Sequence, residues 1–312
     1  MNGSGKRGRR RAAAAAVGAL AAVSVLLPAA AAADELVVEK RGSSKAAVAD
    51  YWTPARMARA RPLELVREPG GEVAVERGGK DPFNHPAIFE SGRVPEPTAP
   101  GSSINGKLFG RIKGVGGYEC SATSVDAANR NLIMTAGHCV AEPSNRKFAK
   151  KLAFVPAYEE EARPFGTWVF DRIVVLRSWR RNSNFNYDFA AVELEPQGTL
   201  NLQDAVGGVP VATHLPADQT YYSVGYPVNL DSGQKMRYCR SDFQGYDPNP
   251  IAHGPRPIAI GCDMGAGASG GGWFVNGSLN SVTSFGYDNH PDVGYGPYFG
   301  SKTDLVYAKG AR

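Results

Sequence analysis

From residue 104 onward, the sequence consists of short runs rich in Val, Ile, Tyr and Phe, separated by Gly, Pro, Asn or Asp. β-branched and aromatic residues suit a pleated surface, and the separating residues suit tight turns, so this alternation predicts antiparallel strands. Long amphipathic helical patterns are nearly absent from this region. The clearest predicted strands are 108–115, 132–135, 168–176, 189–194, 221–226 and 279–285. The expected fold class is therefore all-β.

The length of this strand-rich region favours two small barrels over a single sandwich. We expect residues 104–312 to form one unit of two antiparallel β-barrels, at about 104–200 and 201–312. Two barrels packed side by side leave a cleft between them, where residues from both halves of the chain can meet.

The N-terminus has the pattern of an export signal. Its first residues are basic and are followed by an apolar run, Ala12–Leu27, and then by small residues at 31–33. That run is short for a membrane span of about 20 residues. We therefore predict a signal peptide over 1–33 with cleavage before Asp34. A retained transmembrane anchor is the alternative.

The net charge belongs to this N-terminal segment. The chain carries a formal charge of +5, and the excess is matched by five basic residues that would leave with the signal peptide, Lys6, Arg7, Arg9, Arg10 and Arg11. The exported chain is then formally neutral, which removes the electrostatic reason to expect a nucleic-acid partner. We expect a secreted, extracellular monomer that binds neither nucleic acid nor, after signal cleavage, a membrane.

Residues 34–103 differ in composition from the strand-rich region. They are charged and proline-bearing, with one helical stretch near 46–60 and few strongly apolar side chains, so we expect them to bury little core. A run with Pro95, Pro97 and Pro100 reads as a linker. We interpret 34–103 as a propeptide. An N-terminal extension that stays attached is the alternative.

Four cysteines suit a chain sent to an oxidising compartment. Three pairings are possible, and we favour Cys120 with Cys139 and Cys239 with Cys262, because these close two short loops in separate halves. No spacing typical of a zinc or calcium site occurs. We therefore predict two disulfides, no metal and no cofactor.

Three local motifs hold a histidine, an acid and a serine. His138 follows an apolar strand within Thr-Ala-Gly-His-Cys, Asp188 precedes a strand within Asn-Tyr-Asp-Phe-Ala, and Ser269 lies among glycines in 265–272. A serine becomes a nucleophile when a base takes its proton, and a carboxylate holds that base in the required tautomer. The glycines suit an oxyanion hole, for which Gly267 and Ser269 are the predicted N–H donors.

These motifs, in the order His, Asp, Ser, resemble the chymotrypsin-like or trypsin-like serine peptidases over most of residues 105–312. The resemblance implies two barrels with the active site between them, a serine endopeptidase activity and protein or peptide substrates. It also implies that Ser284, Phe285 and Gly286 form the strand that pairs with substrate backbone and walls the primary pocket. Gly225-Tyr226-Pro227 is similar to the secreted bacterial branch that includes the glutamyl endopeptidases.

Two positions bear on activation and specificity. Ala268 stands where animal digestive members carry an aspartate that pairs with a new N-terminus, so that activation switch is not expected. Asp263 lies at the offset from Ser269 at which trypsin-like members hold the aspartate on the pocket floor, which favours Arg or Lys substrates. The alternative is that Asp263 is a turn residue, because Cys262 directly precedes it whereas the trypsin pattern has a cysteine nearer the serine. No histidine occurs in Val282–Phe285, the place where glutamyl members carry one, so a Glu preference is not favoured.

Several other interpretations were weighed. A serine among glycines also fits the nucleophile elbow of an α/β-hydrolase, but there the acid and histidine follow the serine. A non-catalytic binding protein on the same fold is the alternative from another class. Tyrosines between 221 and 246 could form a carbohydrate platform, but such residues are more often sheet surface and core. The remaining histidines are interpreted as exposed loop residues: His85, His214, His253 and His290.

Overall fold

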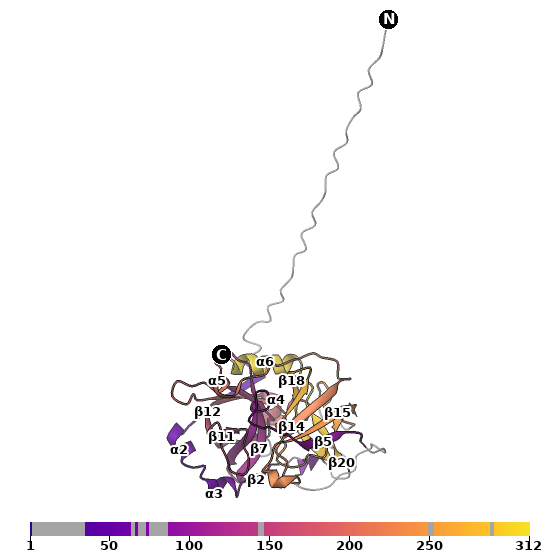
Figure 1. Ribbon diagram of the computed structural model, residues 1–312. Coiled ribbons are helices and arrows are strands. Elements are labelled where there is room, and N and C mark those ends of the chain that lie inside the picture. Colours follow the sequence, from indigo (N-terminus) through magenta and orange to yellow (C-terminus); the bar gives the residue numbers. More distant parts are fainter. Residues whose placement is uncertain are drawn as a thin grey trace.

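The computed structural model describes Met1 and residues 35–63, 66–67, 73–74, 87–142, 147–248, 253–287 and 290–312. The predicted signal peptide and His85 lie outside the described residues, Met1 excepted. The described chain is mainly β-structure, arranged as two large, mainly antiparallel sheets and a third sheet of two short strands, which confirms the expected fold class. Figure 1 draws β7, β11 and β12 of the first sheet on the left, and β14, β15 and β20 of the second on the right.

Six strands of the first sheet close into a barrel, since β6 pairs with both β7 and β11 and the remaining pairs complete the ring. In order around the barrel they are β6 (Asn105–Ile112), β7 (Gly116–Val125), β8 (Leu132–Thr135), β13 (Ala190–Leu194), β12 (Trp168–Leu176) and β11 (Lys150–Pro156). The strand predicted at 108–115 thus ends at Ile112, where a turn leads into β7.

The second sheet is a curled half-barrel. Its path begins with β18 (Ser278–Val282), β17 (Gly272–Val275), β14 (Thr220–Gly225), β15 (Arg237–Tyr246) and β16 (Ile258–Gly261), and continues through β20 (His290–Gly296) and β19 (Phe285–Tyr287). The strand predicted at 279–285 is interrupted at Thr283 and Ser284, which lie between β18 and β19.

Shorter elements connect or cover these sheets. The helices are α2 (Lys45–Ala49), α3 (Pro54–Met57), α4 (Arg177–Asn182), η1 (Phe185–Tyr187), α5 (Leu202–Val206), η2 (Asp231–Gly233) and α6 (Ser301–Gly310). The remaining strands are β1 (Leu36–Lys40), β2 (Arg61–Pro62), β3 (Val66–Arg67), β4 (Val73–Ala74), β5 (Glu90–Arg93), β9 (Ala141–Glu142) and β10 (Lys147–Phe148). None of the helices in the described ranges is long and apolar enough to cross a membrane.

The N-terminal segment is packed into the domain, contrary to the expectation that it buries little core. Val48, Trp52 and Met57 are buried in one cluster with Phe109 and Tyr158 of the first barrel. β1 pairs with β12, and β5 pairs with β15 of the second sheet. The prediction failed because it counted apolar residues within the segment, whereas these few side chains complete a surface that the barrel already presents.

A buried ion pair links the two halves. Lys107 Nζ of β6 lies 2.8 Å from Glu119 Oε2 of β7 and donates to the carbonyl of Gly233 in the second half. Burial lowers the pKa of Lys107 and raises the pKa of Glu119, and their mutual attraction opposes both shifts.

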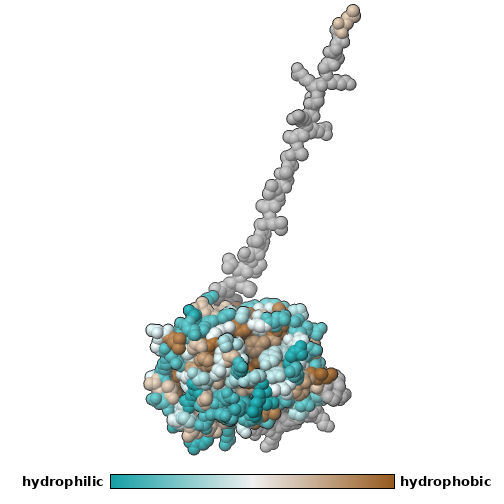
Figure 2. Space-filling model, in the orientation of Figure 1, coloured by the Kyte–Doolittle hydropathy of each residue, from teal (hydrophilic) through white to brown (hydrophobic). Residues whose placement is uncertain are grey.

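The surface of the molecule is mixed in character. The face drawn in Figure 2 carries both hydrophilic and hydrophobic residues.

Candidate active site

His138 is held in place by the acid that was predicted as its partner. It follows β8, and its backbone N–H donates to Asp188 Oδ1 at 2.7 Å while its ring Nδ1 lies 2.7 Å from Oδ2. Both side chains are almost fully buried. A carboxylate facing Nδ1 favours the tautomer that carries its proton there and leaves Nε2 as the acceptor.

Local sequence explains why these two groups approach so closely. A Cβ atom on Gly137 would lie 2.9 Å from Asp188 Oδ1 and 2.8 Å from the ring of Trp179, so the position requires glycine. Asp188 itself caps η1 just before β13. Its Oδ2 also accepts a hydrogen bond from Ser284 Oγ at 2.5 Å. The carboxylate is thus bound by groups from both halves of the chain.

The two disulfides are those favoured from the sequence. Cys120 is joined to Cys139, and Cys239 is joined to Cys262. The first bridge ties β7 to the residue that follows His138. Two groups of residues in the described chain have the spacing of metal ligands, but each contains both sulfurs of one disulfide, which lack the thiolate charge that a metal would bind.

Ser269 lies in the turn between β16 and β17, flanked by glycines in left-handed conformations. Gly267 has φ +90° and Gly270 has φ +80°, which side-chain-bearing residues rarely adopt. A Cβ on Gly270 would also lie 2.1 Å from Thr135 Oγ1. The glycine-rich motif is therefore required both by its own turn and by its close approach to β8.

The same turn leaves two N–H groups free. The carbonyl before Gly267 accepts a hydrogen bond from Val228 N at 2.8 Å, and the carbonyl before Ser269 accepts one from Gly271 N at 2.9 Å. In a trans peptide the N–H points away from its carbonyl. The N–H groups of Gly267 and Ser269 point away from these partners, and neither donates to another group within the described chain.

One hydrogen bond of the predicted triad is not formed. Nε2 of His138 is buried and has no partner among the described groups, Ser269 Oγ included. Hydrogen bonds between a base and a nucleophile are often long in the absence of substrate and shorten when it binds. The structure joins His138 to Asp188 directly, whereas Ser269 lies on the loop of the other half.

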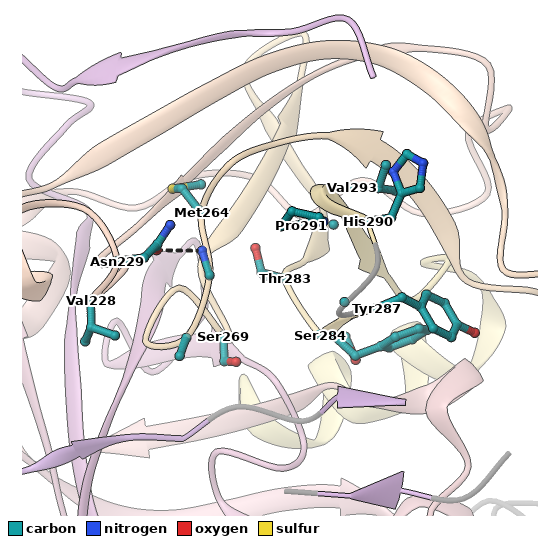
Figure 3. A pocket seen from close by; sticks show the side chains of 15 residues that line it. Val228, Asn229, Met264, Ser269, Thr283, Ser284, Tyr287, His290, Pro291 and Val293 are labelled. Atoms are coloured by element: carbon teal, nitrogen blue, oxygen red, sulfur yellow. Dashed lines mark hydrogen bonds between the residues drawn. The ribbon is translucent and has the colours of Figure 1, made fainter. Parts of the chain in front are cut away.

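A cavity of about 440 Å³ opens beside Ser269. Ser284, Phe285 and Gly286 line it, as the resemblance to the peptidases implied, and Met264 lines it from another side. Figure 3 shows Thr283 between Ser269 and the far wall formed by Pro291, His290 and Val293. The cavity therefore lies where a side chain next to the attacked carbonyl could be bound.

Asp263 is not among the residues that line this cavity, which differs from the prediction that it floors the pocket. Its Oδ2 accepts a hydrogen bond from Ser91 Oγ at 2.8 Å, and its backbone carbonyl accepts one from Asn229. The partner that holds this carboxylate is on β5, in the N-terminal segment. The prediction used only the sequence distance between Asp263 and Ser269, which carries no information on the contact with Ser91.

Most of the other lining residues were not predicted from the sequence, and His290 and Thr283 are two of them. His290, interpreted as an exposed loop residue, lines the cavity because it pairs with Tyr287 in the β19–β20 hairpin. Thr283 lines it too, and its Oγ1 accepts a hydrogen bond from the Trp273 indole. The pairing of Tyr287 with His290 in the β19–β20 hairpin is the feature that places His290 at the cavity.

A family model, two curated proteins and several solved structures match this chain. Residues 99–304 match the model of the trypsin family. The chain is 26% identical over 131 residues to a glutamyl endopeptidase of Bacillus licheniformis, covering 38% of this chain and 41% of that protein. It is 24% identical over 183 residues to an extracellular metalloprotease of Bacillus subtilis, covering 53% and 57%. These alignments thus span about half the length of the curated relatives.

Solved structures match over nearly their whole length. The thermostable serine protease AL20 from an extremophilic microorganism is 34% identical with a TM-score of 0.63, covering 68% of this chain and 99% of that one. The protease Anisep from Arthrobacter nicotinovorans is 31% identical with a TM-score of 0.63, covering 72% and 99%. A Glu endopeptidase, 19% identical with a TM-score of 0.55 and covering 73% and 99%, shares the fold.

Proposed function

This chain belongs to the trypsin family, and we propose that it is a secreted serine endopeptidase with Ser269 as nucleophile, His138 as general base and Asp188 as the group that orients His138. The observation that carries the proposal is the double contact of Asp188 with His138, made through both carboxylate oxygens. It supports a histidine whose Nε2 can accept a proton.

In the proposed reaction, Ser269 Oγ attacks the carbonyl carbon of the scissile peptide bond and its proton passes to His138 Nε2. The carbonyl oxygen becomes an oxyanion, to which the N–H groups of Gly267 and Ser269 donate. His138 then gives the proton to the leaving amine, and an acyl ester remains on Ser269. Water, deprotonated by the same Nε2, hydrolyses the ester and restores the serine.

Substrates are proposed to be proteins or peptides whose side chain next to the scissile bond enters the cavity beside Ser269. The lining includes Val228, Met264, Phe285 and Val293, and no described lining residue is a carboxylate. A buried cationic side chain needs an anionic partner. We therefore propose that the pocket takes an uncharged side chain in preference to Arg or Lys.

The N-terminal segment, residues 34–103, is proposed to be a propeptide that covers the substrate strand. Support comes from β3, which pairs in parallel with β19 through Val66 and Gly286. Gly286 belongs to the strand proposed to bind substrate backbone, so β3 and a substrate would compete for one edge. Export is supported by the two disulfides and by the relative described as extracellular.

Two experiments test this function. Casein hydrolysis by the secreted chain, with Ser269→Ala as the matched variant, separates a peptidase from a non-catalytic binding protein on this fold. N-terminal sequencing of the active protein should find a start between about Ser91 and Asn105, because residues 95–101 of this range lie outside the strands and are mostly exposed, and such backbone is readily cut. Full activity in a chain that still begins at Asp34 would contradict the inhibitory propeptide.

A further inference from the structure

Ser121 of β7 connects the first barrel to the second half of the chain. Both its backbone N–H and its side-chain hydroxyl form hydrogen bonds there. Its N–H donates to the Ser269 carbonyl at 2.7 Å, and its Oγ donates to the Gly267 carbonyl at 2.9 Å. The same Oγ accepts the N–H of Tyr226 at 3.0 Å. The residue is 1% exposed, so water does not compete for these bonds.

These contacts fall on the two residues proposed as oxyanion donors. Gly267 has a positive φ and lacks a side chain, so its own backbone does little to fix the orientation of its peptide groups. The carbonyl before it is held by Val228, two residues beyond Tyr226. Ser121 Oγ thus joins two segments. One is the loop that carries Gly267 and Ser269, and the other is the turn from Tyr226 to Val228, which orients the Gly267 N–H.

The other side of Ser121 is anchored to the strand that precedes the histidine. Its carbonyl accepts a hydrogen bond from Thr135 Oγ1 at 2.8 Å. The preceding residue, Cys120, is bonded to Cys139, which follows His138. Ser121 therefore lies at the junction of three segments that bear the base, the nucleophile and the turn at Val228.

We propose that the Ser121 hydroxyl is a positioning group for the reaction. It fixes the Gly267 carbonyl, which lies between the two donor N–H groups in the chain, and it holds the Tyr226 turn that leads to Val228, relative to the strand that carries His138. Ser121 touches neither substrate nor the reacting atoms in this role and acts through Gly267 and Tyr226. The inference rests on the proposed peptidase function and adds a residue that the three sequence motifs do not contain.

The test is Ser121→Ala, with Ser124→Ala as its matched control. Ser124 lies on the same strand, is buried, and donates its Oγ to the Gly207 carbonyl at 2.8 Å, away from the nucleophile loop. Each variant loses one buried serine hydroxyl that donates to a backbone carbonyl. Ser121→Ala also leaves the Tyr226 N–H without its acceptor and should lower Tm more, so the kinetics of the two variants are compared at equal distance below their own Tm values.

For Ser121→Ala we expect kcat to fall about tenfold with KM unchanged, because a displaced oxyanion donor weakens binding of the transition state only. The rate of phosphonylation by a fluorophosphonate should fall by a similar factor. Ser124→Ala should leave both rates unchanged. Ser121→Gly, which also removes the hydroxyl and keeps the N–H, takes the place of Ser121→Ala if that variant does not accumulate.

Equal kcat values in wild type and Ser121→Ala, equal losses in the two alanine variants, or a change confined to KM would each overturn the positioning role. The proposed peptidase function is tested separately by the wild type and Ser269→Ala. An active wild type with an unaffected Ser121→Ala variant would refute the inference and leave the peptidase standing.

Discussion

Asp188 contacts His138 at two points, accepting its backbone N–H with one carboxylate oxygen and facing its ring Nδ1 with the other, each at 2.7 Å. The first contact fixes the backbone that carries the ring, and the second fixes the ring itself. Because Ser284 Oγ also donates to this carboxylate, three hydrogen bonds fix its position against the histidine.

Replacing Asp188 by Asn should therefore lower kcat by about 10⁴-fold, since an amide at this position favours the wrong histidine tautomer. Ser284→Ala, which removes one donor to the same carboxylate, is the graded control and should lose about tenfold. Steady-state kinetics and a melting curve for each variant provide the comparison. An Asp188→Asn enzyme within tenfold of wild type would be incompatible with the orienting role.

The two disulfides should differ in their effect on activity. Each closes a loop of similar length, with sequence separations of 19 and 23 residues, and loop-closure entropy gives about 3 kcal/mol of stability for either. The double alanine variant at Cys120 and Cys139 should lose activity at temperatures where it is still folded, because Cys139 follows His138. The variant at Cys239 and Cys262 should keep more activity at equal distance below its Tm. The reverse order would contradict this.

The buried Lys107–Glu119 pair should be far more sensitive to losing one partner than to losing both. Lys107→Met leaves an unpaired carboxylate in the interior and should lower the free energy of unfolding by about 3 kcal/mol. Adding Glu119→Leu should restore most of that loss. Denaturant unfolding of wild type, both single variants and the double variant measures the coupling, and additive losses would show that the pair is not coupled.

Asp263 should have no special effect on basic substrates, because it does not line the cavity beside Ser269. Asp263→Ser is expected to change kcat/KM by the same factor for peptides that differ only in Arg, Leu or Tyr before the scissile bond. The wild type should prefer Leu or Tyr to Arg. A selective loss against Arg would restore Asp263 as the floor of the pocket.

The sequence was informative where the determinants are local. Each of the His138, Asp188 and Ser269 motifs occupies a short stretch of sequence, and the disulfides close short loops, so motif and spacing were sufficient to name them. The conformation of Asp263 depends on Ser91, which is 172 residues away in the chain. Trp52 likewise is buried only because it packs against the first barrel. Such contacts are set by tertiary structure, which neither composition nor spacing encodes directly.

The most direct test of the central claim is to label the secreted protein with a fluorophosphonate and to identify the modified residue by peptide mass spectrometry. The activated serine should react and ordinary serines should not, because in the proposed mechanism Ser269 is the serine that has both a base and an oxyanion hole. We predict a single adduct on Ser269, with His138→Ala abolishing it in a folded protein. An adduct on another serine, or labelling that persists without His138, would contradict the account.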